Sequence, residues 1–171
     1  PVNYLVAPDD EAFLTRLRAE RDQYNGYNLI FGHHRHLQVF NNHQNKVETL
    51  TPGVHGLSNA DLNSPWPKIQ RGVAAITALC QSHTPLKHDA LFHILSDDTP
   101  ADDAQLPQTG IPASLERRLS SIFIHTERYG TRASTLLLVD AEDTLHWHER
   151  AYTPDGALRH ETHVSWQLAT V

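Results

Sequence analysis

The chain has 171 residues, of which 39% are hydrophobic and 20% are charged, and its formal net charge is −6. This composition is typical of a folded globular protein, and the negative charge excludes a general role in binding nucleic acid or acidic membranes. No apolar run approaches the roughly 20 residues that cross a bilayer, so we expect a protein that is not transmembrane. The single cysteine excludes an internal disulfide and favours a cytoplasmic location.

The first third of the chain predicts one helix followed by an antiparallel meander. Apolar residues recur at helical spacing over residues 9–24, and Asn25-Gly26 ends this helix. Three short apolar stretches separated by tight turns then predict strands at 27–32, 36–41 and 46–50.

A stiff loop separates this meander from the next helix. The stretch from Leu50 to Gly72 reads LTPGVHGLSNADLNSPWPKIQRG and concentrates proline and glycine. These residues set backbone angles rather than fill a core, so the segment is expected to hold one defined shape. Loops fixed between regular elements tend to carry binding and catalytic groups, which makes this the first place to look for a site.

The following segment predicts two or three helices. Residues 66–82 form a helix with Pro67 in its first turn, and residues 86–96 and 113–119 form shorter ones. The apolar stripe of the first helix is predicted to be buried, and it consists of Ile69, Val73, Ile76, Leu79 and Cys80. Cys80 is therefore interpreted as a buried structural thiol. The aspartate- and proline-rich stretch 97–112 is predicted to be a surface loop.

Strands end the chain. The patterns predict strands at 121–124, 133–140, 144–152 and 160–168, with a hairpin around Glu142-Asp143. Helices followed by runs of antiparallel strands indicate an α+β fold, which we expect to span residues 1–171 as a single domain.

Thirteen histidines raise the question of a metal site. His33, His34 and His36 cluster in one turn, and His146 and His148 lie two apart on a strand and share a face. The chain has no HExxH motif and too few cysteines for a thiolate zinc site, so no metal centre is predicted. Two interpretations of the histidines stay open: surface side chains, or ligands to haem iron.

Two polar residues stand out near the predicted elements. Asn59 in the stiff loop could donate an amide N–H to a developing oxyanion, or could simply stabilise the loop. Arg132 precedes a core strand, where a charge implies an ion pair or recognition of an anion. The chain has no GxSxG elbow, phosphate-binding glycine loop or dinucleotide fingerprint.

Five blocks of the sequence resemble one known family. They are YNGYNLIFG (24–32), LTPGVHGLSNADLNSPWPK (50–68), SSIF (120–123), YGTRASTLLLVD (129–140) and HER (148–150). In this order they strongly resemble the NRDE family, also called the transport and Golgi organisation protein 2 family. The resemblance covers nearly the whole chain.

The resemblance implies an N-terminal-nucleophile hydrolase-like layered fold, with stacked antiparallel sheets flanked by helices. Family members begin with a Met-Cys segment and an Asn-Arg-Asp-Glu motif, and this sequence has neither. We therefore expect the N-terminal part of the fold to be missing, and an uncovered edge to favour a homodimer.

The resemblance also implies a function, namely intracellular haem trafficking. Haem or another small hydrophobic ligand would be the partner. One alternative is an amide hydrolase whose nucleophilic cysteine lies outside this chain, so that the chain alone is inactive, and another is an acyl-lipid or acyl-CoA binding protein. The residues carried over are Asn59 and Arg132 as catalytic candidates and, as binding candidates, His55, Ser58, Trp66 and Asn28.

Overall fold

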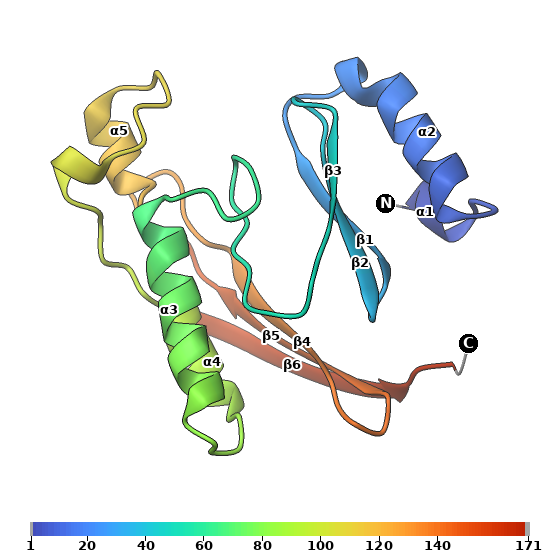
Figure 1. The fold of residues 1–171 in the computed structure, drawn as a ribbon. Coiled ribbons are helices and arrows are strands. Elements are labelled where there is room, and N and C mark those ends of the chain that lie inside the picture. Colours follow the sequence, from blue (N-terminus) through green and yellow to red (C-terminus); the bar gives the residue numbers. More distant parts are fainter. Residues whose placement is uncertain (1, 170–171) are drawn as a thin grey trace. The chain divides into compact units, whose positions relative to one another are not determined.

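The computed structural model describes residues 2–169, and Pro1, Thr170 and Val171 lie outside the described part. Figure 1 shows its elements in chain order. The chain forms two compact units, Pro1–Ser64 and Pro65–Val171, each of which carries a three-stranded antiparallel sheet and helices. The α+β class predicted from the sequence is confirmed.

The first unit places two helices before its sheet. The Asp9 carboxylate accepts a hydrogen bond from the Ala12 N–H at 2.7 Å, which caps the longer helix where the sequence predicts its start. The four-residue helix at the N-terminal end was not predicted. The elements are α1 (Val2–Leu5), α2 (Asp10–Glu20), the 3₁₀ turn η1 (Arg21–Gln23), β1 (Asn28–His33), β2 (His36–Asn41) and β3 (Lys46–Thr49).

An aromatic core holds α2 against this sheet. Phe13 from α2 meets Phe31 of β1 edge to face at a centroid distance of 5.3 Å, and both are buried together with Phe40 of β2. The strands lie in the order β1-β2-β3 as the predicted meander requires, with Leu29 opposite Phe40. Asn28 and Asn41 form the first pair of the same ladder, at the end of the sheet that leads into the candidate site.

The helices of the second unit lie close to their predicted positions. They are α3 (Pro67–Gln81), α4 (His88–Leu95), the 3₁₀ turn η2 (Asp103–Gln105) and α5 (Ala113–Arg118). The predicted burial of the α3 stripe is wrong, because no described residue of that helix is buried. Cys80 is exposed, which corrects its interpretation as a buried thiol. It lies about 100° round the helix from Leu79, beyond the edge that packs on the core.

The sheet of the second unit follows the predicted hairpins. It consists of β4 (Ala133–Val139), β5 (Thr144–Tyr152) and β6 (Leu158–Gln167) in that order. Leu136 of β4 packs with Leu91 and Phe92 of α4, so α4 covers one face of the sheet. Side chains alternate along a strand, so Leu137 lies on the opposite face and is exposed.

One predicted strand, 121–124, does not form. The Ser121 hydroxyl donates to the Phe123 carbonyl at 2.6 Å, and the Phe123 N–H donates to the Asp97 carbonyl at 2.8 Å. These bonds, one local and one to a residue 26 positions away, take the place of a strand ladder, and in the described part of this segment a single bridge between His125 and Gly130 forms. The stretch 97–112 is irregular apart from η2, although Ala101 and Leu106 within it are buried.

None of the described helices combines the length and apolar character that spanning a bilayer requires.

Candidate functional site

Three hollows are lined by residues of the segments 24–32, 50–68 and 129–140. Two of the hollows lie in the first unit and one in the second. We call them the asparagine hollow, the apolar hollow and the arginine hollow. Their volumes are about 270, 370 and 110 Å³. The asparagine hollow is lined by Gly26, Tyr27, Asn28, Asn41, His43 and Asn59. The apolar hollow is lined by Asn3, Phe13, Arg16, Leu17, Glu20, Tyr24, Tyr27, Asn28 and Leu29.

Asn42 shapes the turn that leads into Tyr27, a residue that lines both of these hollows. Its Oδ1 accepts from the Tyr27 N–H at 2.6 Å, and its Nδ2 donates to the carbonyls of Arg21 and Asn25, each at 3.1 Å. The side chain is only 4% exposed. A buried amide that makes three bonds to backbone groups fixes the path of residues 21–27 and hence the position of Tyr27.

Asn28 ties the stiff loop to the first strand. Its Nδ2 donates to the carbonyl of Ser58 at 2.7 Å and to that of Ala60 at 2.9 Å, on either side of Asn59. Because both neighbours are acceptors, the orientation of the Asn28 amide is determined. Its Oδ1 is buried, and within residues 2–169 no donor reaches it. Asn28, a predicted binding residue, therefore positions Asn59, and its Oδ1 is a buried acceptor without a partner in the described residues.

The remainder of the loop is held by its own side chains. The Asn63 Oδ1 accepts from the Gly56 N–H at 2.9 Å, and the Asn63 side chain lies 3.1 Å from the Nδ1 of His55. The Nε2 of His55 lies 2.8 Å from the Thr51 carbonyl, an acceptor, which assigns the proton to Nε2. The structure thus places His55, another predicted binding residue, in a bracing role inside the loop and not among the residues that line the asparagine hollow.

Asn59 is exposed and lines the asparagine hollow. Asn41 and His43 join it there, and neither residue was predicted from the sequence. Asn41 accepts from the Gln44 N–H at 2.9 Å, which closes the β2–β3 turn and brings His43 to the rim. The register pair of Asn28 with Asn41, once the meander was predicted, was the signal that could have identified this second asparagine. The hollow offers neutral amide donors and acceptors beside one imidazole.

The apolar hollow lies where α2 faces the start of β1. Phe13, Leu17 and Leu29 line its apolar surface, while Arg16 and Glu20 pair with each other at 2.8 Å. Burial, followed by the neighbouring Tyr24 and Glu20, raises the pKa of the Tyr27 phenol, which is therefore neutral at physiological pH. Tyr27 and Asn28 line both this hollow and the asparagine hollow, so the two adjoin.

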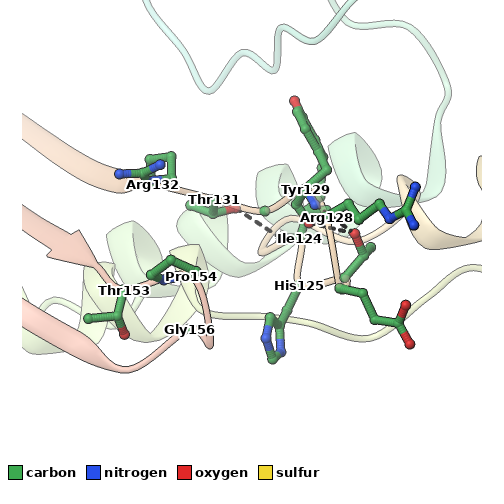
Figure 2. Close-up of a pocket in the computed structure, with 12 residues that line it drawn as sticks. Ile124, His125, Arg128, Tyr129, Thr131, Arg132, Thr153, Pro154 and Gly156 are labelled. Atoms are coloured by element: carbon green, nitrogen blue, oxygen red, sulfur yellow. Dashed lines mark hydrogen bonds between the residues drawn. The ribbon is translucent and has the colours of Figure 1, made fainter.

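The arginine hollow is formed by the YGTR segment and the turn after β5, as Figure 2 shows. The Ile124 N–H donates to the Thr131 hydroxyl at 2.9 Å, and the Thr131 N–H returns a bond to the Ile124 carbonyl at 2.7 Å. A Cβ at Gly130 would lie 2.9 Å from that carbonyl, so this close approach requires glycine. In Figure 2 the side chains of Arg128 and Arg132 extend away from each other.

Arg132 is exposed, and in the described part of the chain no carboxylate forms an ion pair with it. The structure thus places Asn59 and Arg132 in different units, each beside its own hollow. Trp66 caps the start of α3 in the second unit, with the Lys68 ammonium 5.7 Å from its ring centroid. Of the six predicted site residues, Asn28, Ser58 and Asn59 are brought together.

Two groups of histidines line none of the three hollows, whereas His43 and His125 line the asparagine and arginine hollows. His33 and His36 pair at the tip of the β1–β2 hairpin. His148 lies between His88 of α4 and His163 of β6, with ring centroids 3.7 and 4.0 Å away. It is 7% exposed, and burial, reinforced by these neighbouring rings, lowers its pKa. Residues 2–169 contain no group of three or more histidine, cysteine or carboxylate side chains arranged to hold a metal ion.

Comparison with known sequences adds an independent observation. The family described as Transport and Golgi organisation 2 matches residues 1–154. The bovine Transport and Golgi organization protein 2 homolog is 32% identical over 167 residues, which are 90% of this chain and 60% of that protein. The human protein of the same description is 29% identical over 170 residues, 84% of this chain and 62% of its own length. The chain thus spans about 60% of the length of the curated relatives it matches.

Proposed function

This chain belongs to the transport and Golgi organisation 2 family, and from that premise we propose that it binds a small hydrophobic ligand and carries it within the cytoplasm. The observation that supports the proposal is the apolar hollow between α2 and β1, with a volume of about 370 Å³. Pockets of this size with apolar and aromatic walls and a few polar groups are typical of small-molecule sites. Haem is the ligand that the family resemblance implies, and it is the first to test.

The residues of the apolar hollow fit part of haem chemistry. Phe13, Leu17 and Leu29 offer apolar contacts to a porphyrin, and Arg16 lies at a position to pair with a propionate if it releases Glu20. Tyrosine is a known haem ligand, and Tyr24 is the exposed phenol of this hollow. The clusters His33–His36 and His146–His148 do not line it, so our proposal moves the iron ligand from histidine to Tyr24.

Titration of the whole chain with haem, followed by its Soret band, tests this proposal. We expect a saturable shift that Leu17→Gln weakens about tenfold, because a polar amide replaces an apolar wall, a loss of about 1.4 kcal/mol. Leu14→Gln is the matched control, since Leu14 is a similarly half-buried leucine on the same helix and does not line the hollow. Equal affinities for the two variants, or no shift with the unmodified chain, would overturn the proposal.

A second candidate function rests on Asn59. An amide hydrolase with an N-terminal-nucleophile hydrolase-like fold needs an amide donor beside its tetrahedral intermediate, and Asn59 is an exposed amide at a hollow. Its nucleophile would be a cysteine in front of this chain. A protein extended by the family's Met-Cys segment should then be labelled at that cysteine by an N-acyl electrophile, and labelling confined to Cys80 would rule the hydrolase out.

A further inference from the structure

We infer that the apolar and asparagine hollows together form one site for a single-chain acyl amide, with its hydrocarbon tail in the first and its polar head in the second. The inference rests on the proposed function, namely binding of a small hydrophobic ligand by this unit. It adds the chemical class of the ligand and the position of each of its parts. Three features of the first unit carry it.

The first feature is that the two hollows adjoin and differ in character. Tyr27 and Asn28 line both, so a ligand that enters one meets the other at the start of β1. One side presents Phe13 and Leu17, and the other presents Asn41 and Asn59. An apolar surface that passes directly into a neutral hydrogen-bonding surface matches an amphiphile with an uncharged head.

The second feature lies at the junction itself. The Oδ1 of Asn28 is buried, and no donor within the described residues bonds to it, while its Nδ2 is committed to the carbonyls of Ser58 and Ala60. A buried carbonyl oxygen of this kind gains most from a ligand N–H or O–H placed at the same depth. A ligand with an amide N–H between tail and head supplies that donor, whereas an ester at the same position supplies only acceptors.

The third feature concerns charge. The residues of the asparagine hollow include no lysine, arginine or carboxylate, and the Arg16 guanidinium of the apolar hollow is paired with Glu20. A carboxylate head placed in the asparagine hollow would therefore lose its hydration without gaining a lysine or arginine partner among the residues that line that hollow. The site favours a head that ends in a hydroxyl or amide over a free fatty acid.

Three probe ligands separate the contributions when they are titrated into the whole chain by calorimetry. N-dodecanoyl ethanolamine has the tail, the amide N–H and a hydroxyl head. The ester 2-hydroxyethyl dodecanoate replaces only the N–H by oxygen, and N-methyl dodecanamide keeps the N–H but lacks the head hydroxyl. We expect the ester to bind about tenfold more weakly than the ethanolamide, because the Asn28 acceptor then lacks its donor.

Two protein variants locate the ends of the ligand. Asn59→Ala should weaken the ethanolamide about threefold and leave the N-methyl amide unchanged, because only the former reaches the head subsite. Leu17→Gln should weaken all three ligands alike. Gln70→Ala removes an exposed amide of α3 in the second unit, which lines neither hollow, and serves as the matched control for Asn59. Circular dichroism of each variant shows whether it has folded.

The outcomes distinguish this inference from the proposed function. Equal affinities for amide and ester, or an Asn59→Ala effect that is the same with and without the head hydroxyl, would overturn the inference while leaving hydrophobic-ligand binding in place. If neither haem nor any of the three amphiphiles binds, the proposed function itself fails.

Discussion

The two three-stranded sheets of this chain differ in the residues that their helix-covered faces carry. In the first unit Phe31 and Phe40 turn toward α2 and are buried. In the second unit the face that α4 covers carries His148 beside Leu136, while Leu137 and Trp166 lie exposed on the other face. The same topology therefore supports an apolar core in one case and a partly polar one in the other.

This difference follows from the alternation of side chains along β5. His146, His148 and Arg150 share the covered face, and Trp147 lies between them on the other. The covered polar groups are stabilised by specific partners. The Arg150 guanidinium, for example, lies 4.1 Å from the centroid of the Phe92 ring and donates a hydrogen bond to Asp89. The stability of the second unit should therefore depend on pH, and that of the first mainly on packing.

The largest expected effect is the loss of an aromatic ring from the first core. Phe40 is fully buried, so Phe40→Ala should lower the free energy of unfolding by about 3–5 kcal/mol through lost burial and a residual cavity. Urea denaturation followed by circular dichroism measures the loss. Leu137→Ala, on the exposed face of β4, should change it by less than about 0.5 kcal/mol. Similar losses for both would show that the contrast between the sheets is wrong.

The next effect concerns the buried amide that shapes the site. Asn42→Ala removes three hydrogen bonds to backbone groups and should cost about 1–3 kcal/mol. Hydrogen exchange of the Tyr27 amide should accelerate, because that N–H loses its acceptor. Gln44→Ala, in the neighbouring exposed turn, is the control. An unchanged exchange rate at Tyr27 would mean that Asn42 does not hold this turn.

Acid should weaken the second unit selectively. The pKa of His148 is lowered in the folded chain, so below the ordinary histidine pKa of about 6.5 the unfolded chain binds more protons and stability falls as the pH falls. The titratable and charged groups around it are His88, Asp89, His146, Arg150, Glu161 and His163. All three tryptophans belong to this unit, so their fluorescence reports its unfolding.

The matching variant is His148→Leu. Between about pH 7.5 and pH 5.5 the unmodified chain should lose more unfolding free energy than the variant, which lacks the titrating ring. Phe40→Ala should leave that pH dependence unchanged, because it lies in the other unit. A loss of equal size in His148→Leu would assign the acid sensitivity to other groups.

The smallest effect tests the exposed side of α3. Cys80 is exposed, so a thiol reagent should modify it in the folded chain nearly as fast as in denaturant, and Cys80→Ser should change stability by less than about 0.5 kcal/mol. Strong protection of this thiol would mean that the sequence-based prediction of a buried stripe was right after all.

Most of the helices and strands could be predicted from local sequence patterns. The hairpin strands, the cap at Asp9 and the start of α3 at Pro67 all follow from turn residues, alternation and capping, which act over a few residues. The prediction at 121–124 failed because the Ser121 hydroxyl satisfies a backbone carbonyl that a strand would have paired. The prediction that Cys80 is buried failed for another reason. A helical stripe indicates which face of the helix is apolar, but it does not indicate how much of that face a neighbouring element covers.

The candidate site was predictable only in part. Asn28 and Asn59 were selected from the sequence, yet their relation is a pair of bonds across 30 and 32 positions that no local pattern reveals. Asn41 is placed at the site by the pairing of β1 with β2, and Asn42 is identified by its burial. Both facts are known only from the folded chain. The roles of Asn59 and Arg132 in chemistry remain predictions.

The anchoring of the loop by Asn28 determines which positions of this contact tolerate substitution. The Asn28 amide donates hydrogen bonds to the backbone carbonyls of residues 58 and 60, and every amino acid has a backbone carbonyl. In a saturation library, substitutions at positions 58 and 60 should therefore keep these hydrogen bonds, whereas position 28 should accept few replacements. Tolerance at the two ends of this contact is unequal, although the contact itself is shared.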